Sequence, residues 1–217
     1  RRSPYHRMLD QMAVEILTPF AHGQKVLELG CGTGAILSQV TEIAEKAVGV
    51  DFSEGMLVHA RARGLDVRSA ELGALPFGDA SFDLSYSFRV LPHVPDATGA
   101  IAEAARVTRS GGHIVLELYN PWSLRYLAKR LAGPGRIVES RSEASVFTRW
   151  DSPADVRFML PDSVELIDSY GIRVLTPFAA AHRVPILGPA LQRAERSLSH
   201  SLLRRFSGFY VVVLRKT

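Results

Sequence analysis

The sequence predicts a doubly wound α/β fold, in which helices cover both faces of a mainly parallel sheet. Short apolar runs typical of strands occur at residues 25–29, 47–51, 65–69, 82–87 and 113–119. Segments with helical spacing of their apolar residues separate these runs. Strands that alternate with helices in this way form βαβ units with right-handed crossovers. Such sheets bind ligands at the carboxyl ends of their strands, near the point where the strand order reverses.

A glycine-rich turn follows the first predicted strand. Gly30, Gly32 and Gly34 alternate there, and a helix is expected over residues 35–44. A turn without Cβ atoms lets the backbone approach a nucleotide-like ligand closely, and the amides that open the helix point into the same space. Asp51 ends the second predicted strand, where a carboxylate accepts hydrogen bonds from the hydroxyls of a ribose. Together these features predict a site for a nucleoside cofactor.

Helical periodicity and capping residues place the remaining elements of the first half. Apolar residues from Met8 to Leu17 repeat at helical spacing, which predicts an amphipathic helix over residues 5–18 that stops near Pro19. Ser53 is expected to cap the helix after the second strand. A further helix is expected over residues 96–108, with Pro95 and Asp96 at its start.

The second half of the chain has fewer regular signals. An apolar stripe over residues 124–131 predicts a helix that ends at the Gly-Pro-Gly run 133–135. Residues 136–149 are polar and are expected to be irregular. A capping box from Ser152 to Asp155 predicts a short helix to Leu160, and strands are expected at residues 171–176 and 208–215.

The glycine pattern fits two cofactors. The run from Gly30 to Ala35 satisfies the looser dinucleotide fingerprint G-x-G-x-x-G/A. However, Glu28 stands two residues before the first glycine, and a third glycine falls at Gly34. This acid-x-G-x-G-x-G run resembles the first motif of the class I S-adenosylmethionine-dependent methyltransferases. The resemblance implies that the glycines approach the amino-acid half of the cofactor and that Glu28 orients the loop.

Three further segments continue this resemblance in the order of the family. Residues 51–56 resemble its second motif, which implies that Asp51 binds the ribose and that Met56 packs against the adenine. Residues 70–77 and 81–83 resemble a run common in small-molecule methyltransferases, with Ala70 and Glu71 in place of the usual Gly-Asp pair. Residues 107–116 resemble the family's turn into the fifth strand. The resemblance spans residues 25–119 and implies a seven-stranded, Rossmann-like sheet whose last strand is antiparallel.

The resemblance also implies the cofactor, S-adenosylmethionine, and its product, S-adenosylhomocysteine. Glu28, Asp51, Glu71 and Ser87 all lie at the carboxyl ends of predicted strands, so they are expected to converge on one crevice. Cys31 lies within the glycine loop, where a packing role is expected rather than a reactive thiol. No metal site is predicted. The residues expected to bind the cofactor are Glu28, Gly30, Cys31, Gly32, Gly34, Asp51, Phe52, Met56, Glu71, Leu72, Ser87, Phe88 and Arg89.

Methyl transfer from a sulfonium is an in-line displacement, so the enzyme must mainly hold the nucleophile near attack distance in a dry site. A general base is needed only when the nucleophile arrives protonated. His93 follows the fourth strand and is either this base or a loop histidine beside the cofactor. Arg89 pairs with the cofactor carboxylate, with an anionic substrate or with a surface carboxylate. Tyr5, Tyr119 and Trp122 are expected to line the acceptor pocket.

The length of 217 residues predicts one domain, with a cofactor-binding core at 1–119, an acceptor-site elaboration at 120–207 and a final strand at 208–217. Residues 1–119 carry 11 Lys and Arg against 14 Asp and Glu, whereas the remainder carries 15 against 8. A basic half attracts nucleic acid, an anionic membrane or an acidic substrate, but scattered arginines favour a solvated surface. One cysteine, no membrane-spanning run and no visible signal peptide predict a cytoplasmic protein.

The expected function is methyl transfer to a small, hydrophobic molecule at oxygen, nitrogen or carbon. The run Asn120-Pro121-Trp122 is similar to the N-P-P-Y motif of adenine-amino methyltransferases, but it follows the fifth strand and lacks the second proline. Nucleic acid is therefore not the expected acceptor. An RNA methyltransferase, an NAD(P)-dependent oxidoreductase and a non-catalytic cofactor-binding protein remain alternatives. The basic stripe at 125–130 would alternatively lie on a membrane surface, and no oligomeric state is predicted.

Overall fold

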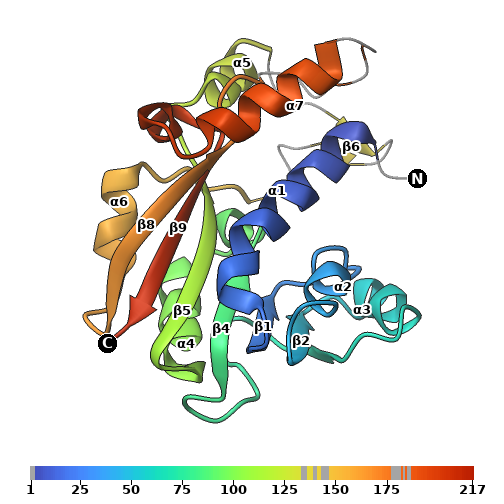
Figure 1. Cartoon of the computed structure of the whole chain (residues 1–217), viewed down its shortest axis with the longest axis vertical. Coiled ribbons are helices and arrows are strands. Elements are labelled where there is room, and N and C mark those ends of the chain that lie inside the picture. The colour runs from blue at the N-terminus through green and yellow to red at the C-terminus, as the bar shows by residue number, and fades with distance from the viewer. Residues whose placement is uncertain are drawn as a thin grey trace.

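The computed structural model describes residues 3–132, 136–138, 141–142, 147–176, 182, 184 and 187–217. Seven strands form one sheet in the order β3-β2-β1-β4-β5-β9-β8, flanked by helices as predicted (Figure 1). The strands are β1 (Lys25–Leu29), β2 (Lys46–Asp51), β3 (Val67–Ser69), β4 (Phe82–Ser87), β5 (Thr108–Tyr119), β8 (Val164–Ile172) and β9 (Phe209–Lys216). The helices are α1 (Pro4–Ala21), α2 (Leu37–Val40), α3 (Glu54–Arg61), α4 (Ala97–Val107), α5 (Leu124–Ala132), α6 (Pro153–Met159) and α7 (Leu187–Leu198), with 3-10 turns η1 (Leu91–His93) and η4 (Leu202–Phe206).

The direction of the strands follows the prediction. Strands β3, β2, β1, β4 and β5 are mutually parallel. Strand β9 is antiparallel to both of its neighbours and lies between β5 and β8. The chain leaves β1 toward β2 on one side and later returns to β4 on the other, so the strand order reverses at β1. The carboxyl ends of β1 and β4 therefore bound the crevice at which a doubly wound sheet binds its ligand.

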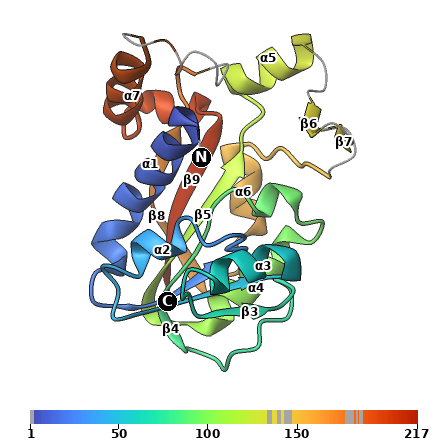
Figure 2. The same cartoon turned by 90° about the vertical axis from the view of Figure 1, so that its right-hand side faces the viewer.

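Two apolar layers sandwich the sheet, because successive strand residues point to opposite faces. Val26 packs with α1, α2 and α3, whereas the adjacent Leu27 packs with α4 and α6. Both side chains are fully buried. Helices α5 and α7 lie beyond the carboxyl end of β5, at the opposite end of the sheet from the C-terminus (Figures 1 and 2). Helices α5 and α7 thus lie at the end of the sheet that holds the crevice.

Several elements differ from the sequence-based expectation. Helix α1 continues through Pro19 to Ala21, because a proline this close to the end of a helix removes little hydrogen bonding, and the N–H of His22 still bonds the carbonyl of Thr18 at 3.3 Å. Helix α2 is shorter than expected. The side chain of Ser53 makes no capping hydrogen bond; its backbone N–H instead donates to Asp51 at 2.9 Å.

The strand expected at residues 171–176 is displaced toward the N-terminus. Strand β8 begins at Val164 and pairs with β9 until Ile172. Arg173 then adopts a left-handed backbone conformation with φ of 65°, which turns the chain away from the sheet. A two-stranded sheet of β6 (Arg136–Val138) and β7 (Arg141–Ser142) lies in the segment expected to be irregular. The expected helix stop at 133–135 falls outside the described residues.

The capping box at the start of α6 is confirmed. The hydroxyl of Ser152 accepts the N–H of Asp155, whose carboxylate accepts the N–H of Ser152 in return. Within the described ranges, none of the helices combines the length and the apolar character that a membrane crossing demands.

Candidate active site

A cavity of about 670 Å³ opens at the carboxyl ends of β1, β2 and β4. Its volume falls in the range typical of cofactor sites. Seven residues predicted for the site border it, namely Gly30, Asp51, Phe52, Glu71, Leu72, Arg89 and His93. It is also bordered by Ala70, Gly73, Val90, Val94, Pro95 and Asp96, none of which was among the residues expected to bind the cofactor. Their only signal in the sequence is that they flank the motif residues, in the loops after β3 and β4.

The glycine loop is fastened to the end of β2. The N–H groups of Gly30 and Cys31 both donate to the carbonyl of Val50, at 2.7 and 2.9 Å. Gly30, Gly32 and Gly34 all have positive φ angles, a conformation that residues with a side chain rarely adopt. At Gly30 a Cβ atom would overlap the side chain of Val90. The loop therefore needs glycine there both for its conformation and for the close approach of the segment after β4.

Asp51 connects the tip of β2 to this loop. One carboxylate oxygen accepts the N–H of Gly32 at 2.8 Å, and the other accepts the N–H of Ser53 at 2.9 Å. Asp51 is nearly buried, yet it borders the cavity. A carboxylate has about four lone-pair sites, so each oxygen retains capacity for a further donor. Asp51 is thus positioned to accept hydrogen bonds from the hydroxyl groups of a ligand in the cavity.

Glu28 and Cys31 lie beneath the loop rather than in the cavity wall. Glu28 is buried, and its carboxyl group accepts the hydroxyl of Tyr86 at 3.2 Å. Burial raises the pKa of Glu28 to about 8, although the Tyr86 hydrogen bond and Arg89 oppose the shift. Burial likewise raises the pKa of the Cys31 thiol to about 12, so this thiol stays protonated and serves for packing.

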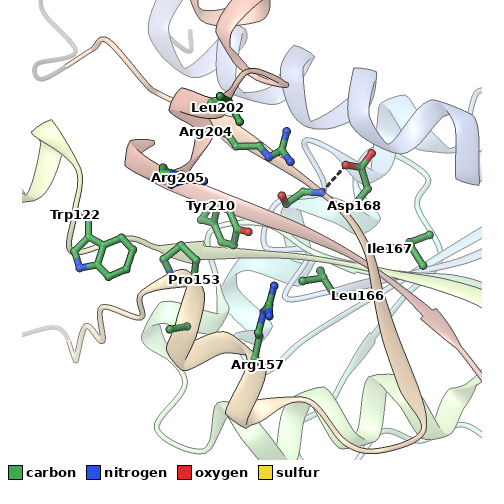
Figure 3. Close-up of a pocket in the computed structure, with 12 residues that line it drawn as sticks. Trp122, Pro153, Arg157, Leu166, Ile167, Asp168, Leu202, Arg204, Arg205 and Tyr210 are labelled. Atoms are coloured by element: carbon green, nitrogen blue, oxygen red, sulfur yellow. Dashed lines mark hydrogen bonds between the residues drawn. The ribbon is translucent and has the colours of Figure 1, made fainter.

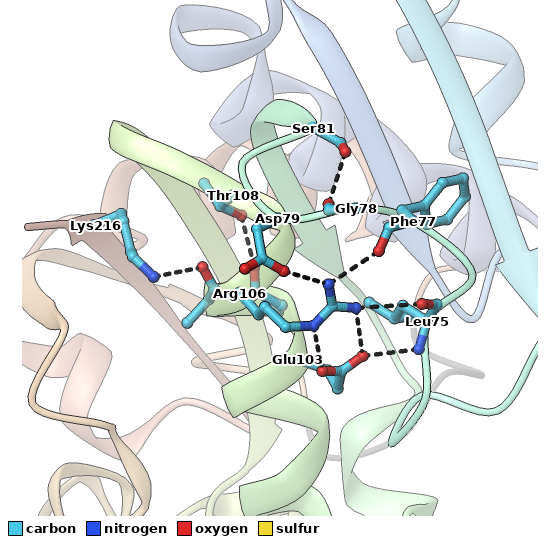
Figure 4. Close-up of polar contacts among 11 residues, drawn as sticks. Leu75, Phe77, Gly78, Asp79, Ser81, Glu103, Arg106, Thr108 and Lys216 are labelled. Atoms are coloured by element: carbon cyan, nitrogen blue, oxygen red, sulfur yellow. Dashed lines mark hydrogen bonds and ion pairs between the residues drawn. The ribbon is translucent and has the colours of Figure 1, made fainter.

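A network of polar contacts fixes the loop that follows β3 (Figure 4). The guanidinium of Arg106 in α4 donates to the carbonyls of Leu75 and Phe77, at 3.2 and 2.9 Å. It also pairs with Asp79 and Glu103, and Glu103 accepts the N–H of Leu75. Because Glu71 and Leu72 precede these anchored residues in the same loop, α4 determines where they meet the cavity.

Arg89 is held between two carboxyl groups. Its guanidinium forms an ion pair with Asp10 of α1 at 2.7 Å, and its backbone N–H donates to the carboxylate of Glu117 in β5 at 3.1 Å. Glu117 is buried, which raises its pKa to about 7 despite the nearby Arg89 and Arg125. The positive φ of Arg89 lets the chain turn sharply after β4. Of the three partners expected for this arginine, the structure places a carboxylate of α1 against it.

Comparison with known proteins identifies the segment that builds this cavity. A family model described as a methyltransferase domain matches residues 27–116. The chain is 36% identical over 100 residues to a Mycolicibacterium smegmatis protein named "probable S-adenosylmethionine-dependent methyltransferase". It is 37% identical over 131 residues to demethylmenaquinone methyltransferase of Mycobacterium bovis. These alignments cover 45% and 56% of this chain.

Residues 27–116, which match the family model, are therefore similar to an S-adenosylmethionine-dependent methyltransferase domain. The aligned part of the chain spans 39% of the length of the Mycolicibacterium smegmatis relative and 56% of the length of the Mycobacterium bovis relative. The fold agrees with a SAM-dependent methyltransferase from Thermotoga maritima, with a TM-score of 0.70 at 19% identity over 98% of this chain and 91% of that one. The cofactor named for the Mycolicibacterium smegmatis relative is S-adenosylmethionine.

The described residues of the methyltransferase domain fit this cofactor. Asp51 offers free lone pairs at the cavity, and at Gly32 a Cβ atom would project into open space that a ligand can fill instead. Glu71 borders the same cavity, as a partner of the adenine would. Asp51 and the glycine loop would thus hold the ribose and the amino-acid half, and Glu71 and Leu72 would meet the base.

His93 and Tyr119 meet beside the cavity of the methyltransferase domain. The Nε2 atom of His93 lies 3.4 Å from the Tyr119 hydroxyl, and Nδ1 lies 2.9 Å from the carbonyl oxygen of Phe147. A carbonyl only accepts, so in neutral His93 the proton resides on Nδ1 and Nε2 keeps its lone pair. Burial raises the pKa of Tyr119 to about 12, so its phenol remains a donor.

Other predicted residues take different places in the structure. Trp122 lies in a separate groove. The turn after β5 directs it there, and this turn is closed by a hydrogen bond of 3.0 Å from the backbone N–H of Trp122 to the side-chain oxygen of Asn120. Tyr5 is a buried residue of α1, and its ring centroid lies 5.3 Å from that of His182. Ser87 and Phe88 are buried in the sheet and core, while Met56 is half exposed on α3 and Phe52 is largely exposed.

Proposed function

We propose that this protein transfers the methyl group of S-adenosylmethionine to an oxygen, nitrogen or carbon atom of a small, hydrophobic molecule. The observation that carries the proposal is the joint placement of Asp51, the glycine loop and Glu71 around one cavity. The relative named demethylmenaquinone methyltransferase supports a small-molecule acceptor. We further propose that residues 1–217 act as one unit, in which the elements after residue 120 select the acceptor.

When bound, S-adenosylmethionine supplies an electrophilic methyl group on a sulfonium centre. The chain's own contribution is to bind and orient, and the fixed loop amides and Asp51 do so without rearrangement. Arg89 brings a positive charge to the cavity wall, where it would face the carboxylate of the cofactor. Its ion pair with Asp10 keeps the guanidinium in one position, and the hydrogen bond from its backbone N–H to Glu117 fixes the chain at this residue.

His93 is the candidate general base for an acceptor that arrives protonated. Its Nδ1–H is engaged by the Phe147 carbonyl, so Nε2 is the nitrogen that can take a proton. The Tyr119 hydroxyl lies 3.4 Å from Nε2, which is a long hydrogen-bond distance. A hydroxyl group of the methyl acceptor could take the place of the Tyr119 hydroxyl at Nε2 or bind beside it. Tyr119 then orients the acceptor, while His93 holds the proton.

Calorimetric titration with S-adenosylhomocysteine tests the cofactor site directly, with NADH as a parallel control. Micromolar binding of S-adenosylhomocysteine without binding of NADH is the expected result. Binding of NADH alone would make the protein an oxidoreductase and would overturn the proposal. Methyl transfer is then checked with radiolabelled S-adenosylmethionine and a panel of apolar phenols, quinols and amines. Cofactor binding without transfer to any of them would favour a non-catalytic binding protein.

A further inference from the structure

A second hollow lies away from the proposed cofactor cavity and shares no lining residue with it. This groove has a volume of about 560 Å³ and runs between α6, β8, the start of β9, η4 and the turn after β5. Figure 3 shows its lining side chains. We call it the arginine groove, because Arg157, Arg204 and Arg205 all line it. None of the motifs that point to methyl transfer accounts for it.

The arginine groove carries an excess of positive charge, because three arginines line it and Asp168 is the single acidic residue among its described lining residues. Across the described part of the chain, the side chains of Arg157 and Arg205 have no hydrogen bond or ion pair, and both residues are exposed. Arg204 donates to the carbonyl of His200 at 2.9 Å, which leaves its charge uncompensated. In Figure 3, Arg157 reaches from α6 toward Tyr210 and η4, so arginines approach the groove from both of its sides.

The nearby carboxyl groups are already engaged elsewhere. Asp168 lines the groove, but its carboxylate accepts the N–H of Ser169 at 2.7 Å and contacts Nε2 of His200 at 3.0 Å. Asp155, on the same helix as Arg157, closes the capping box of α6. Neither carboxylate forms an ion pair with Arg157 or Arg205 in the described part of the chain. The groove is an electropositive hollow that suits an anion.

The rim of the groove is apolar. Leu202 is 77% exposed, Trp122 is 54% exposed and Ile167 is 40% exposed, and all three line the groove. Large apolar side chains at this exposure, beside unpaired arginines, suit a ligand with an anionic head and an apolar body. Arginine is well matched to phosphate, because its planar guanidinium donates two parallel hydrogen bonds to phosphate oxygens.

We propose that the arginine groove binds the phosphate group of an amphiphilic molecule, with Arg157 and Arg205 on the phosphate and Trp122 and Leu202 against the apolar part. Such a group belongs either to a soluble phosphorylated molecule or to a phospholipid headgroup in a membrane. The proposal concerns a site separate from methyl transfer, so it does not depend on the proposed function.

Octyl phosphate, below its micellar concentration, is the soluble probe for this site, and calorimetry measures its affinity. Vesicles of phosphatidylcholine with phosphatidylglycerol, compared with phosphatidylcholine alone, are the membrane probe in a sedimentation assay. The test variant is Arg157→Gln/Arg205→Gln. The matched control is Lys46→Gln/Arg63→Gln, which removes the same charge from exposed positions near β2 and α3. Cooperative thermal unfolding verifies that each variant is folded.

We expect saturable binding by the wild-type protein that weakens at least tenfold in the groove variant and less than twofold in the control. Groove-dependent binding of octyl phosphate alone assigns a soluble ligand, whereas groove-dependent binding of anionic vesicles assigns a lipid headgroup. Equal losses in the two double variants would show that only overall charge matters and would overturn the proposal. The absence of saturable binding to either probe would overturn it as well. Binding of S-adenosylhomocysteine should be the same in all three proteins, which separates this test from that of the cofactor site.

Discussion

The carboxylate of Asp51 accepts the N–H of Gly32 at 2.8 Å, although 19 residues separate the two in the chain. This bond ties the tip of β2 to the middle of the glycine loop that follows β1. The other carboxylate oxygen holds Ser53 at the start of α3. One side chain thus shapes the loop and presents its remaining lone pairs to the cavity.

Replacement of Asp51 by alanine should therefore weaken S-adenosylhomocysteine binding by about 1.5–3 kcal/mol, the range for hydrogen bonds to a charged group. This corresponds to a rise in Kd of roughly 10- to 100-fold, measurable by calorimetry. Glu42→Ala, which removes an exposed carboxylate, is the control and should bind normally. An unchanged Kd for Asp51→Ala would mean that the cofactor site is wrongly assigned.

The neutral tautomer of His93 should carry its proton on Nδ1, because the Phe147 carbonyl 2.9 Å away can only accept a hydrogen bond. Long-range ¹H–¹⁵N spectra at alkaline pH report this tautomer. Tyr119→Phe should shift the Nε2 resonance and leave the proton on Nδ1. Once an acceptor that needs deprotonation is found, His93→Gln should lower kcat by roughly 10²- to 10⁴-fold. A proton on Nε2 in the free protein would remove His93 as the base.

Glu28 should make the protein less stable as the pH rises. Its pKa is raised to about 8 by burial, so the folded state holds this proton more tightly than the unfolded chain does. Ionisation then favours unfolding, and the free energy of unfolding falls between the ordinary glutamate pKa and about pH 8. Each such proton contributes at most about 1.4 kcal/mol per pH unit. Glu28→Gln should flatten this dependence in urea titrations from pH 5 to 8, whereas Glu42→Gln should not.

Arg106 should stabilise the fold more than the nearby Arg109. Arg106→Gln leaves the carbonyls of Leu75 and Phe77 without this donor and breaks two ion pairs, so we expect a loss of about 1–3 kcal/mol. Arg109 pairs with Asp83 while half exposed, so Arg109→Gln should cost no more than about 1 kcal/mol. Thermal unfolding compares the two. Equal midpoints would contradict the role given to Arg106 in anchoring the loop of Glu71.

The sequence determined the sheet and the location of the cavity. Apolar runs predict β1, β2, β4 and β9 closely, because buried strands require consecutive apolar residues. The glycine loop could be assigned because a positive φ favours glycine, and Asp51 because a carboxylate at the carboxyl end of a parallel strand faces the ligand crevice. Both requirements are local, so they can be recognised from the residue types at these positions. The start of β8 was missed, because this edge strand alternates partly exposed residues and is defined by its pairing with β9.

Only the tertiary structure decided how residues distant in the chain meet. Glu28 and Glu117 have raised pKa values because the sheet buries them, and sequence position carries no measure of burial. Trp122, expected in the acceptor pocket, joins Arg157 and Arg205 in the arginine groove, because the turn after β5 and the packing of α6 and η4 orient these side chains. Backbone preferences act over a few residues and can be read along the chain, whereas burial and charge pairing depend on which surfaces the completed fold brings together.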